Sequence, residues 1–244
     1  MSQEAQIVRK GANAALWLST LSFTASFAVW TIFSIIGIQI KQELSLTETQ
    51  FGLLIGTPIL TGSLVRLLLG VWTERFGAKV IFPLVMLAGA ASAYLISAAH
   101  SYAEFLLAAL GLGLAGGTFA VGVAYVSKFF ISEKQGTALG VFGAGNVGAT
   151  ITILAAPTIM VAMGWQAVAQ IWAAGLAAFA VIFFVLAPVE PDIAARRSRR
   201  ERPPSLAAQF AVLRNVQVWR FSLYYFFVFG GFVALSLWLP RYLV

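Results

Sequence analysis

Arg66 is the residue whose type and position most directly suggest chemistry. It lies inside the apolar run Phe51–Trp72. A charge within a membrane span costs about 2.5–3.5 kcal/mol and usually marks a functional site. No Asp or Glu occupies the central part of any apolar run, so a cation at this depth should draw an anion from solution. The guanidinium group is a flat fork suited to small planar anions. The sequence therefore predicts an anion site at Arg66. The alternative is an arginine that only balances charge or reaches toward the membrane surface.

Other polar and aromatic residues fall at a depth similar to that of Arg66. At 1.5 Å per helical residue, Asn146 lies about 15 Å into its apolar run, where its amide N–H would be a second donor to an anion. Gly145 and Gly148 flank it and permit close approach of a backbone. Aromatic rings at this depth would sandwich a flat ion and exclude water, although each ring taken singly is an ordinary core residue. The aromatic candidates are Phe27, Phe119, Tyr225 and Phe229.

Seven apolar runs are long enough to place these residues in a membrane, since about 20 apolar residues cross a bilayer as helix. The chain is 60% hydrophobic and only 10% charged. We expect an all-α polytopic membrane protein with a six-helix bundle over residues 1–187, a basic cytoplasmic linker over 188–217, and the first helix of a second bundle over 218–244. The predicted spans are Ala14–Ile40, Phe51–Trp72, Val80–Ala99, Ala103–Val126, Thr137–Met163, Gln166–Ala187 and Val218–Leu243.

The basic residues predict on which side of the membrane each loop lies. Of the 16 Lys and Arg residues, all but Lys41, Arg66 and Arg241 fall on one side when the N-terminus is placed in the cytoplasm. The positive-inside rule favours this topology, because the reverse would put most basic loops outside. We therefore expect a multi-pass protein of the inner (plasma) membrane with a cytoplasmic N-terminus.

The arginine-rich linker explains the basic charge without nucleic acid. A net charge of +7 would suit nucleic-acid binding, but five arginines lie in one short stretch between apolar runs. There they retain topology and contact anionic membrane lipid. Ser205 is predicted to cap a short helix over Leu206–Leu213. The five arginines are Arg196, Arg197, Arg199, Arg200 and Arg202.

Glycines in the fourth and fifth runs predict close helix packing. The stretch Gly111–Gly117 matches G-x-G-x-x-G, but a dinucleotide site needs this pattern between a strand and a helix, and here it lies inside an apolar run. Small residues instead let membrane helices approach closely. The packing candidates are Gly113, Gly117, Gly136, Gly140 and Gly148.

The loop between the second and third runs resembles a motif of the major facilitator superfamily. That motif is G-x-x-x-D-R-x-G-x-R, and this sequence has Glu in place of Asp and Lys in place of the last Arg. The resemblance implies a gating role for the loop. Its motif residues here are Gly70, Glu74, Arg75, Gly77 and Lys79.

Within that superfamily, three further segments resemble the nitrate/nitrite porters. Residues 143–149 are similar to the signature of the fifth helix, residues 113–120 to the fourth helix, and residues 225–230 to the seventh. The resemblance implies that Arg66 is the substrate arginine and Asn146 the signature amide. It also implies that Phe119, Tyr225, Phe229 and Phe27 line the pocket.

The same resemblance implies a twelve-helix transporter made of two halves, which rock around a central site in alternating access. Its second-half arginine and signature are not in this sequence, so we expect that a C-terminal half is needed for a complete transporter. The expected function is transport of nitrate and/or nitrite. Exchange is favoured because an empty, doubly positive carrier would be reluctant to reorient.

Other functions also fit these residues. A transporter for another small anion, such as a monocarboxylate, also suits a planar fork, and so does a membrane receptor that binds an anion without moving it. An enzyme is disfavoured, because His100 stands alone near an outer loop and no nucleophile–base pair is evident. Cysteine is absent, and we expect neither a metal nor a cofactor.

Overall fold

The computed structural model describes residues 3–199, 201 and 205–242, and every regular element in them is helical. The chain divides into two compact units, residues 1–201 and 202–244. In the first unit the elements are α1 (Gln3–Trp30), α2 (Phe33–Glu43), α3 (Glu48–Phe76), α4 (Ala78–Ala98), α5 (Tyr102–Ser127), α6 (Ser132–Gly143), η1 (Ala144–Val147), α7 (Gly148–Met163), α8 (Trp165–Leu186) and α9 (Pro191–Arg199). The second unit contains α10 (Leu206–Phe210), η2 (Ala211–Arg214) and α11 (Val216–Tyr242).

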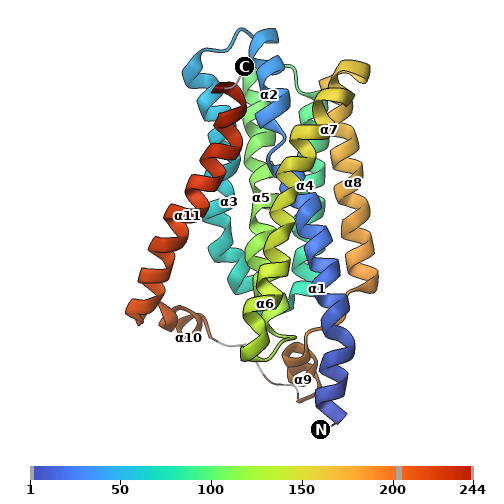
Figure 1. Cartoon of the computed structure of the whole chain (residues 1–244), viewed down its shortest axis with the longest axis vertical. Coiled ribbons are helices and arrows are strands. Elements are labelled where there is room, and N and C mark those ends of the chain that lie inside the picture. The colour runs from blue at the N-terminus through green and yellow to red at the C-terminus, as the bar shows by residue number, and fades with distance from the viewer. Residues whose placement is uncertain (1–2, 200, 202–204, 243–244) are drawn as a thin grey trace. The chain divides into compact units, whose positions relative to one another are not determined.

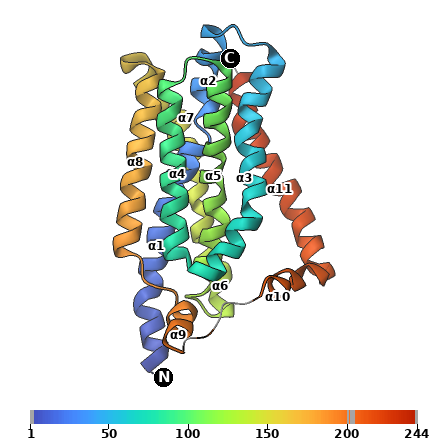
Figure 2. The same cartoon turned by 180° about the vertical axis from the view of Figure 1, so that it is seen from behind.

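Seven helical segments of the described chain are long and apolar enough to cross a membrane. They match the seven predicted runs to within several residues, which confirms the predicted fold class. Six of them form an upright bundle in the first unit (Figures 1 and 2). In this bundle α5 packs against α1, α3 and α4, and α4 also packs along α8. The buried side of α5 is rich in Gly and Ala, so its neighbours approach closely.

The first and fifth spans are each broken in the middle, which the sequence analysis did not predict. The first span breaks at Thr31 and Ile32, between α1 and α2. There Ile32 N donates to Val29 O, three residues back, in place of Ala28 O, four residues back. Ala28 O accepts instead from Thr152 Oγ1 of α7, at 2.7 Å. The fifth span narrows to the 3₁₀ segment η1 between α6 and α7. Both spans consist of two helices meeting at a break.

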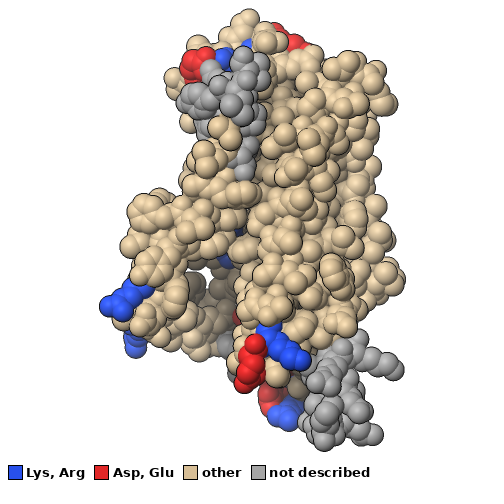
Figure 3. Space-filling model, viewed as in Figure 1, with Lys and Arg blue, Asp and Glu red and all other residues tan. Residues whose placement is uncertain are grey.

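Polar caps define where several helices begin. Thr47 and Gln50 form a capping box at the start of α3, and Ser101 and Glu104 form one at the start of α5. Ser205 accepts from Ala208 N at the start of α10, as predicted. Charged side chains gather toward the ends of the bundle, and its middle is almost free of them on the face shown in Figure 3.

Residues 188–201 belong to the bundle unit, although we expected the linker to begin at residue 188. Tyr125 donates from its hydroxyl group to Pro188 O at 2.6 Å. Glu190 is fully buried and accepts from the backbone N–H of Ala78, the first residue of α4. A carboxylate at a helix N-terminus satisfies a free N–H group and complements the helix dipole. The segment that leads into α9 is therefore anchored to the end of the bundle.

Candidate functional site

Arg66 lies midway along α3 and is half-buried. Its Nη2 donates to the backbone oxygen of Gly116 on α5 at 3.3 Å. Its Cζ stands 5.9 Å from the centroid of the Phe119 ring, one turn further along α5, which is within the range of a cation–π contact. The guanidinium group is therefore oriented by a backbone acceptor and an aromatic face.

The Phe119 ring belongs to a cluster of four phenylalanines from α1, α5 and α6. Phe23 is at its centre, with ring centroids 5.3 Å from Phe119, 4.9 Å from Phe142 and 5.6 Å from Phe27. Of these rings, Phe27 and Phe119 were predicted as site residues. Phe27 reaches the cluster through Phe23 and is buried, with 2% of its surface exposed. Phe23 and Phe142 were not predicted from the sequence.

The signal for Phe23 was present in the sequence. It lies four residues before Phe27, so both rings lie on one face of α1. A Cβ added at Gly145 would lie 2.5 Å from Cδ1 of Phe23. Gly145 therefore lets η1 pack against this ring. Phe23 in turn contacts Phe119, the ring beside Arg66.

Asn146 lies in η1, at the break of the fifth span. Its Nδ2 donates to Gly143 O at 2.8 Å, which occupies one of its two amide hydrogens. Its Oδ1 is buried, and no hydrogen-bond partner for it lies among the described residues. The side chain therefore retains unused hydrogen-bonding capacity beside the aromatic cluster.

The predicted packing glycines fall into two groups. A Cβ at Gly113 would lie 2.8 Å from Pro58 O, one at Gly117 would lie 2.3 Å from a Leu69 methyl, and one at Gly148 would lie 2.2 Å from Thr24 O. These three are sites of close helix approach.

Gly136 and Gly140 do not follow the prediction of close packing. A Cβ at either residue would meet no described atom within 4 Å. Both residues are exposed. Their four-residue spacing defines a small-residue face of α6, but no neighbour in the described part of the chain packs against it.

Tyr225 and Phe229 lie in the second unit, one turn apart on α11. Their rings are stacked, with centroids 4.9 Å apart and an interplanar angle of 12°. They form an aromatic pair within α11, and their place in the pocket stays a prediction.

The predicted gating loop joins α3 and α4. Gly77 has φ +92°, a backbone conformation suited to glycine, and it ends α3. Glu74 forms an ion pair with Lys128 at 2.8 Å. Arg75 is exposed, with its Cζ 5.6 Å from the Phe76 ring centroid, and Lys79 is half-buried in the first turn of α4. Gly70 has open space where a Cβ would lie.

Residues beyond the motif complete the ionic network at this end of the bundle. Lys128 also pairs with Asp192 at 3.1 Å, and Asp192 pairs with Arg196 at 3.4 Å. Arg196 Nη2 donates to Glu74 O at 2.8 Å. Arg196 was expected to retain topology and contact lipid, and in the structure it joins α9 to the loop.

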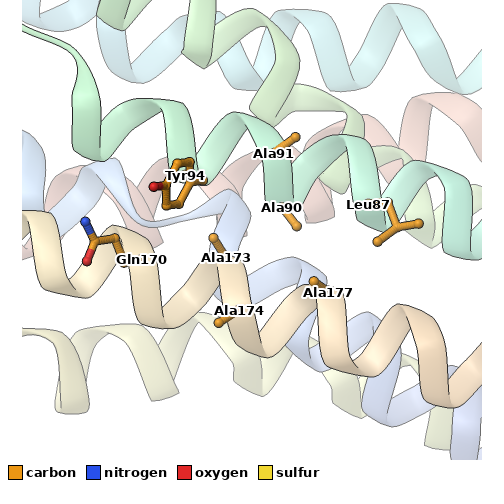
Figure 4. A pocket seen from close by; sticks show the side chains of 8 residues that line it. All are labelled: Leu87, Ala90, Ala91, Tyr94, Gln170, Ala173, Ala174 and Ala177. Atoms are coloured by element: carbon orange, nitrogen blue, oxygen red, sulfur yellow. The ribbon is translucent and has the colours of Figure 1, made fainter.

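A groove of about 510 Å³ lies elsewhere, between α4 and α8. Figure 4 shows the side chains that line it, mostly alanines with Tyr94 and Gln170 toward one end. It contains no charged residue and none of the predicted site residues. It is therefore a poor candidate for anion binding. Within the described residues, no three His, Cys, Asp or Glu side chains are grouped to hold a metal ion.

The chain belongs to the major facilitator superfamily. The sequence model described as "Major Facilitator Superfamily" matches residues 18–244. A solved structure described as a bacterial homolog of the human lysosomal transporter Spinster has a similar fold. Its TM-score is 0.64 at 19% identity, over 72% of this chain and 44% of that one.

Curated relatives narrow the similarity further. A "Probable nitrate/nitrite antiporter NarK1" of Thermus thermophilus is 40% identical over 94% of this chain and 53% of that protein. A "Nitrite extrusion protein" of Bacillus subtilis is 35% identical over 94% of this chain and 56% of that protein. A "Probable nitrate transporter NarT" of Staphylococcus epidermidis is 32% identical over 97% of this chain and 59% of that protein. The chain spans about half the length of these relatives.

Proposed function

We propose that this chain supplies the N-terminal substrate-binding half of a transporter that moves nitrate and/or nitrite by alternating access. The observation that carries the proposal is the setting of Arg66, whose fork is oriented by Gly116 O and the face of Phe119. A planar fork beside aromatic rings suits a flat, singly charged anion. Relatives named for nitrate and nitrite support this choice.

The complete transporter in this proposal contains a second six-helix half. Alternating access is the rocking of two halves around a site between them. A substrate that neutralises the cationic centre would permit closure, which favours nitrate/nitrite exchange over uncoupled flux. The protein lies in the inner membrane with its N-terminus in the cytoplasm.

Substitution of Arg66 tests the proposal in the complete transporter. Arg66→Lys keeps the charge but loses the fork, and Arg66→Ala loses both. A charge-assisted hydrogen bond contributes about 1.5–3 kcal/mol, so nitrate affinity should fall roughly ten- to over a hundredfold in both variants. Nitrate binding and exchange in proteoliposomes measure the effect.

Arg199→Lys is the matched control, because that side chain is 72% exposed and its ion pair with Glu201 spans 3.8 Å. It should bind nitrate as the unmodified protein does. Competition by nitrite, formate and acetate identifies the anion class. Unchanged nitrate affinity in folded Arg66→Ala would refute the site, and stronger competition by acetate than by nitrite would indicate a monocarboxylate transporter.

A further inference from the structure

Trp30 lies where the Arg66 helix meets the helix that orients Arg66. It is the last residue of α1 and is buried, with 5% of its surface exposed. Its Nε1 donates to Pro58 O of α3 at 3.1 Å. Pro58, Gly62 and Arg66 follow one another at four-residue intervals, so they lie along one side of α3. The indole is therefore hydrogen-bonded to the helix that carries Arg66.

The same indole is in contact with the acceptor of Arg66. A Cβ added at Gly116 would lie 2.7 Å from both Cε2 and Nε1 of Trp30. Only a glycine leaves room for the ring at this position. Gly116 O is also the atom that accepts from Arg66 Nη2. One ring thus contacts the residue whose carbonyl group orients the fork.

The indole is located where the backbones of α3 and α5 are in close contact. A Cβ at Gly62 would lie 2.8 Å from Gly113 O, and a Cβ at Gly113 would lie 2.8 Å from Pro58 O. The Nε1 of Trp30 is 3.5 Å from the Cβ position of Gly62. The ring therefore packs beside the point where the backbones of the two helices are in contact. Its size limits how far α3 can move relative to α5.

We infer that Trp30 is a positioning residue for Arg66: its hydrogen bond to Pro58 and its contact with Gly116 hold the guanidinium at the spacing required for anion binding. The inference rests on the proposed function. A buried indole N–H needs an acceptor, and removing it takes away a direct hydrogen bond between α1 and α3. Because two hydrogen bonds to one anion require close alignment, a small shift of α3 reduces affinity without removing the arginine.

A double-mutant cycle in the complete transporter tests the inference. Trp30→Phe removes the N–H and part of the ring, and should weaken nitrate binding about five- to tenfold. If Trp30 acts through the fork of Arg66, Trp30→Phe in an Arg66→Lys background should change the dissociation constant for nitrate less than about twofold. The reason is that the free-energy effects of substitutions at coupled residues do not add. Trp30→Tyr, which keeps an aromatic ring and a donor, should bind better than Trp30→Phe and guards against loss of folding.

Trp172→Phe is the matched control. Trp172 on α8 is half-buried and also donates one indole hydrogen bond, to Thr152 Oγ1 at 2.8 Å, on a helix that carries neither Arg66 nor Gly116. Its substitution should lower thermal stability and leave nitrate affinity unchanged. Equal losses from Trp30→Phe in both backgrounds, or normal binding in Trp30→Phe, would refute the positioning role alone. Normal binding in Arg66→Ala would refute the proposed function as well.

Discussion

At the scale of single residues, Asn146 separates a binding role from a local structural one. Its amide holds Gly143 O inside η1 and has a second hydrogen available to an anion. Asn146→Ala should weaken nitrate binding by several-fold, less than Arg66→Ala, because a neutral donor forms a weaker hydrogen bond. Asn146→Asp should weaken it more than alanine does, because a carboxylate repels the anion. Nitrate titration of both purified variants measures this order.

A structural role for Asn146 predicts a different pattern. Neither Asp nor Ala can donate to Gly143 O, so a residue that only shapes the break would lose thermal stability in both variants, and the charge of the carboxylate would not set the loss of nitrate binding. Thermal stability serves as the control, since both variants should remain folded. Tighter nitrate binding in Asn146→Asp than in Asn146→Ala would contradict the assignment.

Residue type alone was enough to single out Arg66, since no other charge lies deep in a span. It was not enough for Phe23 or Trp30. The sequence has 20 Phe and 7 Trp residues, and their roles depend on which rings meet across helices. Contacts between α1 and the glycines of α5 and η1 distinguish these two rings from the rest.

At the scale of helices, Glu190 anchors the segment before α9 to the start of α4. Glu190→Ala leaves the backbone N–H of Ala78 without its acceptor, which should lower the free energy of unfolding by about 1–3 kcal/mol. Glu190→Gln keeps an acceptor oxygen but loses the charge at the helix N-terminus. Its free energy of unfolding should therefore lie between those of Glu190→Ala and the unmodified protein. Apparent melting temperatures in one detergent give the order.

Glu201→Ala is the control for this anchor, because the Glu201 side chain is 54% exposed and pairs with Arg199 at 3.8 Å. It should melt like the unmodified chain. A melting temperature for Glu190→Ala equal to that of Glu201→Ala would show that the anchor contributes nothing.

The two groups of glycines give a matched pair of variants in the fifth span. Gly148→Ala places a methyl group 2.2 Å from Thr24 O and 2.7 Å from Ala28 N, so α1 and α7 must separate. It should lower both folded yield and melting temperature. Gly140→Ala meets nothing within 4 Å and replaces glycine in a helix, so it should be neutral or stabilising by up to about 1 kcal/mol. Equal melting temperatures would contradict this division.

Hydropathy predicted the existence and order of the spans, because a helix that crosses a membrane is recognised by its length and apolar composition alone. It did not predict the breaks at Thr31–Ile32 and Ala144–Val147, which depend on partners from another helix. Ala28 O, for example, accepts a hydrogen bond from Thr152, 124 residues later. The four-residue glycine spacing of α6 looked like that of α5, yet spacing does not reveal whether a neighbour is present.

At the scale of the whole molecule, the bundle carries different charges at its two ends. One end holds the network of Glu74, Lys128, Asp192 and Arg196, followed by the exposed Arg199. The other end has the Lys41–Glu48 pair. The excess of basic loops at the first end favours its cytoplasmic placement, because positively charged loops are retained inside.

Cysteine labelling tests this orientation, since the chain has no cysteine of its own. Ser198 is exposed in α9 and Ser45 is exposed in the turn before α3, so a single Cys at each position reports opposite ends. In intact cells an impermeant maleimide should label Ser45→Cys and leave Ser198→Cys unmodified. After permeabilisation both should react, which controls for thiol accessibility. Ser101→Cys provides a second outer site and should label like Ser45→Cys. Labelling of Ser198→Cys in intact cells, with Ser45→Cys protected, would mean that the arginine-rich end faces outward and that the proposed topology is inverted.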